Sequence, residues 1–173
     1  KTAHRILKNP KIKANISKTN LLLAYYFNKR SLIDSSLYYT NQALKHNTIS
    51  NDSLRYRMSS LCYNLPALNS KKRGLLEESK KWHIKGIEVS QKFNETNLYY
   101  THVHGLAMAY SHLGDFTNAL KLFKQCLDYK KDEEIILGSY INIGDIYSSM
   151  KEYDKSNSYL NKAKNLYEKT DNN

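Results

Sequence analysis

The segment 100–133, YTHVHGLAMAYSHLGDFTNALKLFKQCLDYKKDE, constrains the fold more than any other part of this sequence. The apolar residues of its first half recur at i, i+3, i+4 and i+7, and those of its second half follow the same helical period. The two stripes are Val103, Leu106, Ala107 and Tyr110, then Ala119, Leu120, Phe123, Cys126 and Leu127. Between them, Gly114 can adopt the left-handed conformation that ends a helix, and Asp115 can cap the next one. The segment is therefore predicted to form a helical hairpin.

These residues resemble the tetratricopeptide repeat, whose pattern has the same order of apolar residue, Leu-Gly/Ala, Tyr and then Ala-x3-Phe. Three more copies, at 17–50, 54–95 and 137–170, align on Ser36, Ser79 and Ser156 as the counterparts of Ala119. The resemblance implies an all-α, right-handed superhelical solenoid of about four hairpins, whose concave face is lined by the first helix of each pair. Because one hairpin cannot bury its apolar face alone, stacking neighbours completes the core.

The ends of the chain and the second repeat depart from the pattern. Pro10 interrupts the helical period, so 1–16 is predicted to be a linker or the end of a preceding helix, and 171–173 a tail. In the second repeat, Cys62 is taken as the small residue equivalent to Ala107, which requires a five-residue insertion before Ser79. Pro66 is then predicted to bend or end the first helix, ahead of an exposed basic loop.

Basic residues are concentrated in the first part of the chain. Residues 1–99 carry 18 Lys and Arg against 6 Asp and Glu, whereas 100–173 carry 9 against 10, and the whole chain has a net charge of +11. Lys71, Lys72 and Arg73 form a basic patch. The interpretations are a surface for nucleic acid, an anionic membrane or an acidic partner, or simply a solvated face.

No apolar run is long enough for a transmembrane helix. Since the sequence starts with Lys, we expect an excised domain or a processed product, and localisation stays open between the cytoplasm and an extracytoplasmic sensor.

No catalytic or metal-binding motif is present: the sequence lacks HExxH, a glycine-rich phosphate loop and CxxC. His102 and His104 diverge on a helix, and His112 is about 12 Å of helical rise from His104, too far to share an ion. Cys62 and Cys126 fall at packing positions, which predicts buried small hydrophobes and not nucleophiles or a disulfide. We therefore predict a protein that is not an enzyme and that holds neither cofactor nor metal.

Three functional hypotheses remain. The first is a protein-interaction scaffold that binds a protein, a peptide or a partner helix in the concave groove. The second is a sensor domain, because DSSLYYTNQAL and the long repeats are similar to the sensory repeat regions of membrane-anchored bacterial histidine kinases and helix-turn-helix regulators. The third, nucleic-acid binding through the basic N-terminal half, is disfavoured because no aromatic-and-basic recognition motif accompanies the charge. The oligomeric state is left open.

The resemblance also implies which side chains line the groove. They lie off the packing stripe of each first helix, and carried onto this chain they are Tyr25, Asn28, Tyr56, Tyr63, His104, Met108, Ser111, His112, Asp145 and Ser148. His104 and Met108 stand where chaperone-binding members need Lys and Asn, so a chaperone-tail adaptor is disfavoured. The expected groove is aromatic and neutral-polar, and the alternative is that some of these tyrosines only cover neighbouring helices.

Overall fold

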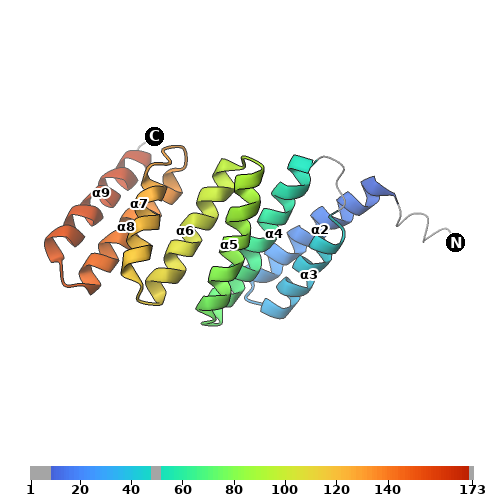
Figure 1. Ribbon diagram of the computed structural model, residues 1–173, viewed down its shortest axis with the longest axis horizontal. Coiled ribbons are helices and arrows are strands. Elements are labelled where there is room, and N and C mark those ends of the chain that lie inside the picture. The colour runs from blue at the N-terminus through green and yellow to red at the C-terminus, as the bar shows by residue number, and fades with distance from the viewer. Residues whose placement is uncertain (1–8, 48–51, 172–173) are drawn as a thin grey trace. The chain divides into compact units, whose positions relative to one another are not determined.

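The computed structural model describes residues 9–47 and 52–171, and every regular element in these ranges is an α-helix (Figure 1). The helices, in chain order, are α2 (Pro10–Lys29), α3 (Ile33–Lys45), α4 (Asp52–Lys72), α5 (Leu76–Lys92), α6 (Thr96–His112), α7 (Phe116–Leu127), α8 (Glu133–Ser149) and α9 (Tyr153–Asp171). They form four successive helical hairpins, which confirms the predicted all-α repeat fold. The chain divides into two compact units, residues 1–99 and 100–173.

In all four hairpins the first helix ends in the same way. One residue takes a positive φ, of 58° at Ser31, 75° at Gly74, 79° at Gly114 and 62° at Lys151. The next residue donates its backbone N–H to the carbonyl five positions back, as from Asp115 to Tyr110 at 3.0 Å. This bond satisfies a carbonyl that the helix end would leave unpaired. The turn is thus a fixed marker that aligns the four hairpins.

The turns place Ala67, not Cys62, at the position of Ala24 and Ala107. The Ser79 hydroxyl donates to the Ala67 carbonyl at 2.9 Å, just as the Ser36 hydroxyl donates to the Ala24 carbonyl at 2.9 Å. Each pair is 12 residues apart, which is also the spacing from Ala107 to Ala119. The five-residue insertion predicted before Ser79 is therefore wrong.

Pro66 lies inside α4, so the predicted end of the helix at this residue is wrong. Its neighbours Leu65 and Ala67 are both fully buried, so packing on each side outweighs the cost of the lost backbone hydrogen bond. The segment after Pro66 is the last turns of α4 and not an exposed loop, because Asn69 and Ser70 are buried. The extra length of the second repeat lies instead at the start of the helix.

The first hairpin also begins earlier than predicted. Pro10 is the first residue of α2, so 10–16 belongs to this helix and not to a linker. The Asn9 side chain accepts a hydrogen bond from the Lys11 backbone N–H at 3.0 Å, which caps the helix. Proline suits the first helical position because its missing N–H would have no partner there. Pro10 therefore starts a helix; residues 1–8, and 172–173 of the expected tail, lie outside the described residues.

Each unit has its own apolar core. The core of the first unit contains Leu21, Ala24, Ala43, Met58, Cys62 and Leu65, and that of the second contains Ala107, Ala119, Phe123, Ile143, Ile146 and Tyr147. Cys62 and Cys126 are buried free thiols, and burial raises the pKa of each to about 12. A thiol that stays protonated at neutral pH behaves as a small packing residue.

Candidate partner-binding surface

In the first unit, polar contacts hold the two first helices, α2 and α4, side by side. The Asn28 side-chain amide donates to Asn69 Oδ1 at 2.7 Å, and Lys72 Nζ donates to the Asn28 carbonyl at 2.8 Å. Tyr25 is half-buried and shares a hydrogen bond with Asn64. Burial raises the pKa of the Tyr25 hydroxyl, and the bond to Asn64 opposes that rise. These contacts hold α2 against α4.

Two of the expected groove tyrosines lie elsewhere in the first unit. Tyr56 stacks on Phe93 with the ring planes 11° apart, and Tyr63 stacks on Trp82 with ring centroids 5.9 Å apart. Both rings therefore pack against residues at or just after α5, within their own hairpin. The cause is the alignment error on Cys62. With Ala67 in the small-residue position, the counterparts of His104, Met108 and Ser111 are Asn64, Leu68 and Lys71.

Of the other predicted positions in this unit, Tyr25 stays on the surface but Asn28 does not. Asn28 is only 8% exposed, and its amide is already committed to Asn69. Its structural use is to join α2 to α4. The corrected alignment adds three side chains to the predicted surface: Asn64, Leu68 and Lys71. They precede Gly74 by the same numbers of residues as His104, Met108 and Ser111 precede Gly114, and this spacing can be read from the sequence.

In the second unit, the predicted groove positions separate into packed and exposed side chains. The His104 ring lies edge-on to Phe123, with centroids 5.3 Å apart, and a Cβ added at Gly138 would lie 3.0 Å from His104 Nε2. Met108 is half-buried against the core. Ser111 is half-buried, whereas His112, Asp145 and Ser148 are exposed. The open part of this surface is therefore polar, and His104 and Met108 contribute mainly to packing.

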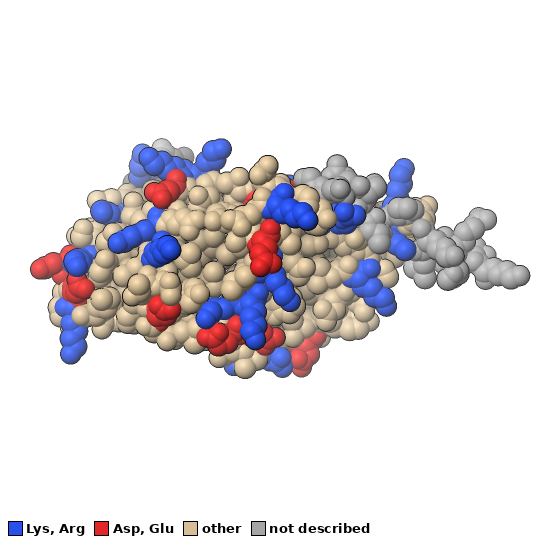
Figure 2. All heavy atoms as spheres, in the orientation of Figure 1, with Lys and Arg blue, Asp and Glu red and all other residues tan. Residues whose placement is uncertain are grey.

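The three residues of the predicted basic patch lie in different surroundings. Arg73 pairs with Asp34 at 3.2 Å, and Lys72 donates to both the carbonyl and Oδ1 of Asn28. Lys71 is half-buried, and this burial lowers the pKa of its amine. Lys72 and Arg73 therefore help to join the first two hairpins. Figure 2 shows Lys and Arg side chains over the N-terminal helices on the face that it draws.

An apolar pocket of about 260 Å³ lies between α2 and α4, away from the basic patch. It is lined by Ala14, Lys18, Leu54, Arg57, Met58 and Leu61. Sequence reasoning missed this pocket because it treated 1–16 as a linker and aligned the second repeat incorrectly. The signal was present, since Leu54, Met58 and Leu61 recur at helical spacing on one face of α4.

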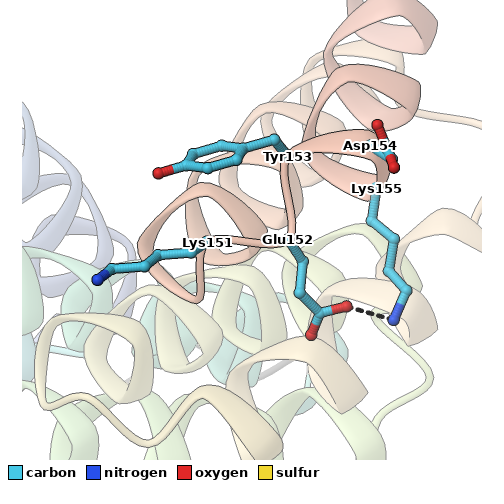
Figure 3. A pocket seen from close by; sticks show the side chains of 5 residues that line it. All are labelled: Lys151, Glu152, Tyr153, Asp154 and Lys155. Carbon is cyan, nitrogen blue, oxygen red and sulfur yellow. Dashed lines mark ion pairs between the residues drawn. The ribbon is translucent and has the colours of Figure 1, made fainter.

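A second hollow, of about 370 Å³, is formed by the five residues 151–155 at the turn between α8 and α9 (Figure 3). Glu152 and Lys155 form an ion pair there, while the side chains of Lys151 and Tyr153 point away from that pair. All five residues belong to one turn. Because their side chains diverge, the hollow brings together no set of groups suited to a ligand.

No group of three or more His, Cys, Asp or Glu side chains suited to a metal ion occurs among the described residues. His102 is fully buried, whereas His112 is exposed at the end of α6. Within 9–47 and 52–171, none of the helices is both long and apolar enough to cross a bilayer.

Comparison with known proteins agrees with this architecture. The tetratricopeptide repeat family model matches residues 101–169. The fold is similar to the crystal structure of the apo form of RapI, with a TM-score of 0.82 and 15% identity, covering 92% of this chain and 58% of that one. It is also similar to BtubC from P. vanneervenii, with a TM-score of 0.76 and 16% identity, covering 94% and 66% respectively. The chain thus spans less than two thirds of either structure, and identities this low show the fold alone. No curated protein matches.

Proposed function

We propose that this chain is a non-enzymatic module that holds a peptide or a partner helix, because the tetratricopeptide repeat model matches residues 101–169 and the fold is similar to that of helical-repeat structures. The bound segment lies against the surface formed by its first helices. In the first unit this surface comprises the exposed sides of α2 and α4, including Tyr25, Asn64 and Leu68.

The observation that carries this proposal is the apolar pocket between α2 and α4. Several apolar side chains of these helices lie in the core of the first unit, whereas Leu54, which lines the pocket, remains 50% exposed. A pocket of 260 Å³ is close to the smallest size that small ligands occupy, and it suits one or two apolar side chains of a longer partner. Anchoring by a few apolar side chains is typical of helix and peptide recognition in grooves.

The experiment is to select binding peptides from a random displayed library on the immobilised chain and then map where they bind. Hydrogen exchange of each complex is compared with that of the free chain. We expect protection in the first helices of a hairpin, as in α2 and α4, and little change in α3 and α5. Protection confined to the second helices, or binding that protects no helix, would rule out the first-helix surface.

A pair of tyrosine variants provides the control. Tyr25→Ala changes the proposed surface, whereas Tyr38→Ala removes a 58% exposed tyrosine from α3. Selected peptides that map to α2 and α4 should bind the Tyr25 variant at least about tenfold more weakly and the Tyr38 variant unchanged. Circular dichroism of both variants checks that each still folds. Equal losses in the two variants would contradict the proposal.

The two alternatives need other measurements. A sensor domain of a membrane-anchored signalling or transcription-regulating protein predicts a membrane helix and an effector domain elsewhere in the gene. Nucleic-acid binding predicts an affinity that falls steeply with salt. The contacts of Lys72 with Asn28 and of Arg73 with Asp34 reduce the cationic surface open to phosphate, which favours a protein partner.

A further inference from the structure

The pocket between α2 and α4, called here the α2–α4 pocket, has an apolar floor and a cation on each side. Met58 is 9% exposed and lies in the floor, with Ala14 and Leu61 half-buried beside it. Lys18 on α2 and Arg57 on α4 are exposed and complete the lining. Each helix therefore contributes one positive charge to the edge of the pocket, and the other lining side chains are apolar.

The sequences of these helices carry almost no negative charge that could balance the two cations. The sequence of α2 contains no Asp or Glu, and that of α4 contains only Asp52, at its first position. Asp34, the acidic residue of α3, already pairs with Arg73. Within the described residues, neither Lys18 nor Arg57 takes part in an ion pair. A ligand that carries carboxylates can therefore supply the missing charges.

We infer that the α2–α4 pocket receives an apolar side chain of an acidic peptide segment, whose flanking carboxylates contact Lys18 and Arg57. This inference rests on the proposed function and specifies the chemistry of the partner. The apolar side chain supplies affinity through burial, and the two cations select the sign of the flanking charge and speed encounter. A partner with apolar residues but basic flanks meets like charges and is rejected.

Other occupants fit the charge less well. Residues 1–8 of this chain, KTAHRILK, contain Ile6 and Leu7 but carry three cations and no acid, so they would bring like charge to the rim. Nucleic acid offers negative charge but does not use an apolar floor. A second copy of the chain could supply the acidic start of α8, but Ile135 within that segment is already buried in its own unit.

The test uses the full chain and short fluorescein-labelled peptides, measured by fluorescence anisotropy at low and at physiological salt. The probe has a Leu-Phe pair flanked on each side by Asp and Glu; one comparison peptide has Ser-Ser in place of Leu-Phe, and another has Lys in place of every acid. We expect the probe to bind and each comparison peptide to bind at least about tenfold more weakly. Equal binding of the Ser-Ser peptide would overturn the inference, because charge alone would then explain the affinity.

Variants locate the site. The double variant Lys18→Glu, Arg57→Glu should bind the probe at least about tenfold more weakly than the parent chain. The control double variant Lys45→Glu, Lys81→Glu changes the net charge equally at exposed positions on α3 and α5, and it should reduce the affinity for the probe much less. Ala14→Phe, which fills the pocket and leaves every charge in place, should also weaken binding. Circular dichroism verifies the fold of each. Equal losses with the two charge pairs, or unchanged binding by Ala14→Phe, would overturn the inference.

The result also separates this inference from the proposed function. If the acidic probe fails to bind but selected peptides of other composition protect α2 and α4 from exchange, only the acidic specificity is wrong. If no peptide protects these helices, both fail. Dimerisation of the chain that is abolished by the Lys18 and Arg57 double variant, without probe binding, would assign the pocket to a second copy and overturn the inference.

Discussion

Asn28 on α2 and Asn69 on α4 are joined by a 2.7 Å hydrogen bond between their side-chain amides, and both side chains are buried. The bond continues on each side, because Asn69 Nδ2 donates to the Ser36 hydroxyl at 3.1 Å and Lys72 donates to Asn28. Ser36 in turn donates to the Ala24 carbonyl. Because these polar groups are satisfied together in only one alignment, the network fixes the first hairpin against the second.

Removing Asn69 should therefore destabilise the first unit. We expect Asn69→Ala to lower the free energy of unfolding by about 1–3 kcal/mol, since it leaves the buried amide of Asn28 without its acceptor. Asn28→Ala should cost a similar amount, and the double variant less than their sum, because it leaves neither partner unsatisfied. Urea denaturation measures all three. Asn157→Ala, at an exposed position on α9, is the control; strictly additive costs would contradict the network.

Gly144 and Leu160 provide a second test, in the second unit. A Cβ added at Gly144 would lie 2.8 Å from both Cγ and Cδ2 of Leu160, closer than real contacts allow. Gly144→Ala alone should lower the free energy of unfolding by about 1–3 kcal/mol through overpacking. In a Leu160→Ala background the same change should raise it by about 1 kcal/mol, because alanine favours the helix once the clash is absent. If thermal unfolding gives the same sign in both backgrounds, the close approach of α8 and α9 is wrong.

The corrected alignment predicts the cost of enlarging small residues. Ala67 and Ala119 are both fully buried where helices of a hairpin meet, so Ala67→Leu and Ala119→Leu should each cost about 1–3 kcal/mol or more. Lys121→Leu, at an exposed position two residues after Ala119, should be nearly neutral. Melting temperatures of the three variants give the comparison. Equal shifts for Lys121→Leu and Ala67→Leu would disprove the alignment.

The sequence alone was sufficient for the third and fourth hairpins but not for the second. In the third, Ala107, Gly114 and Phe123 each mark one position of the repeat, so their order determines the alignment. In the second, Cys62 and Ala67 are both small, and Pro66 suggested a helix end that packing around it prevents. Gly74 identified the correct choice, since its positive φ matches that of Gly114.

The candidate site could be predicted only in part, for a related reason. Helical spacing shows that Tyr56 and Tyr63 lie off one stripe, but it does not show which neighbour their rings contact. That depends on Phe93 and Trp82, which are distant in sequence. The α2–α4 pocket likewise depends on Ala14 and Leu54 lining the same pocket. These residues lie in the first parts of α2 and α4, and only the structure shows how these two helices pack.

The two buried thiols predict how the protein responds to pH. Burial raises the pKa of Cys62 and of Cys126 from 9.0 to about 12, so folding favours the protonated form. The stability that these thiols contribute is complete below pH 9 and is lost as the pH rises toward 12. At pH 8, iodoacetamide should modify the folded chain very slowly and both cysteines rapidly in urea, because only the thiolate reacts. Rapid modification of the folded protein would show that the thiols are accessible.

Lys151 offers a final test, because its φ of 62° lies in a region that glycine adopts without cost. Lys151→Gly should raise the free energy of unfolding by about 0.5–1 kcal/mol, since relief of the left-handed strain exceeds the added entropy of the unfolded chain. Lys121→Gly makes the same chemical change at an exposed position inside α7, where glycine should lower it by about 1 kcal/mol. Urea denaturation of the two variants should thus give opposite signs. If both destabilise the second unit equally, Lys151 does not adopt the conformation that closes the fourth hairpin.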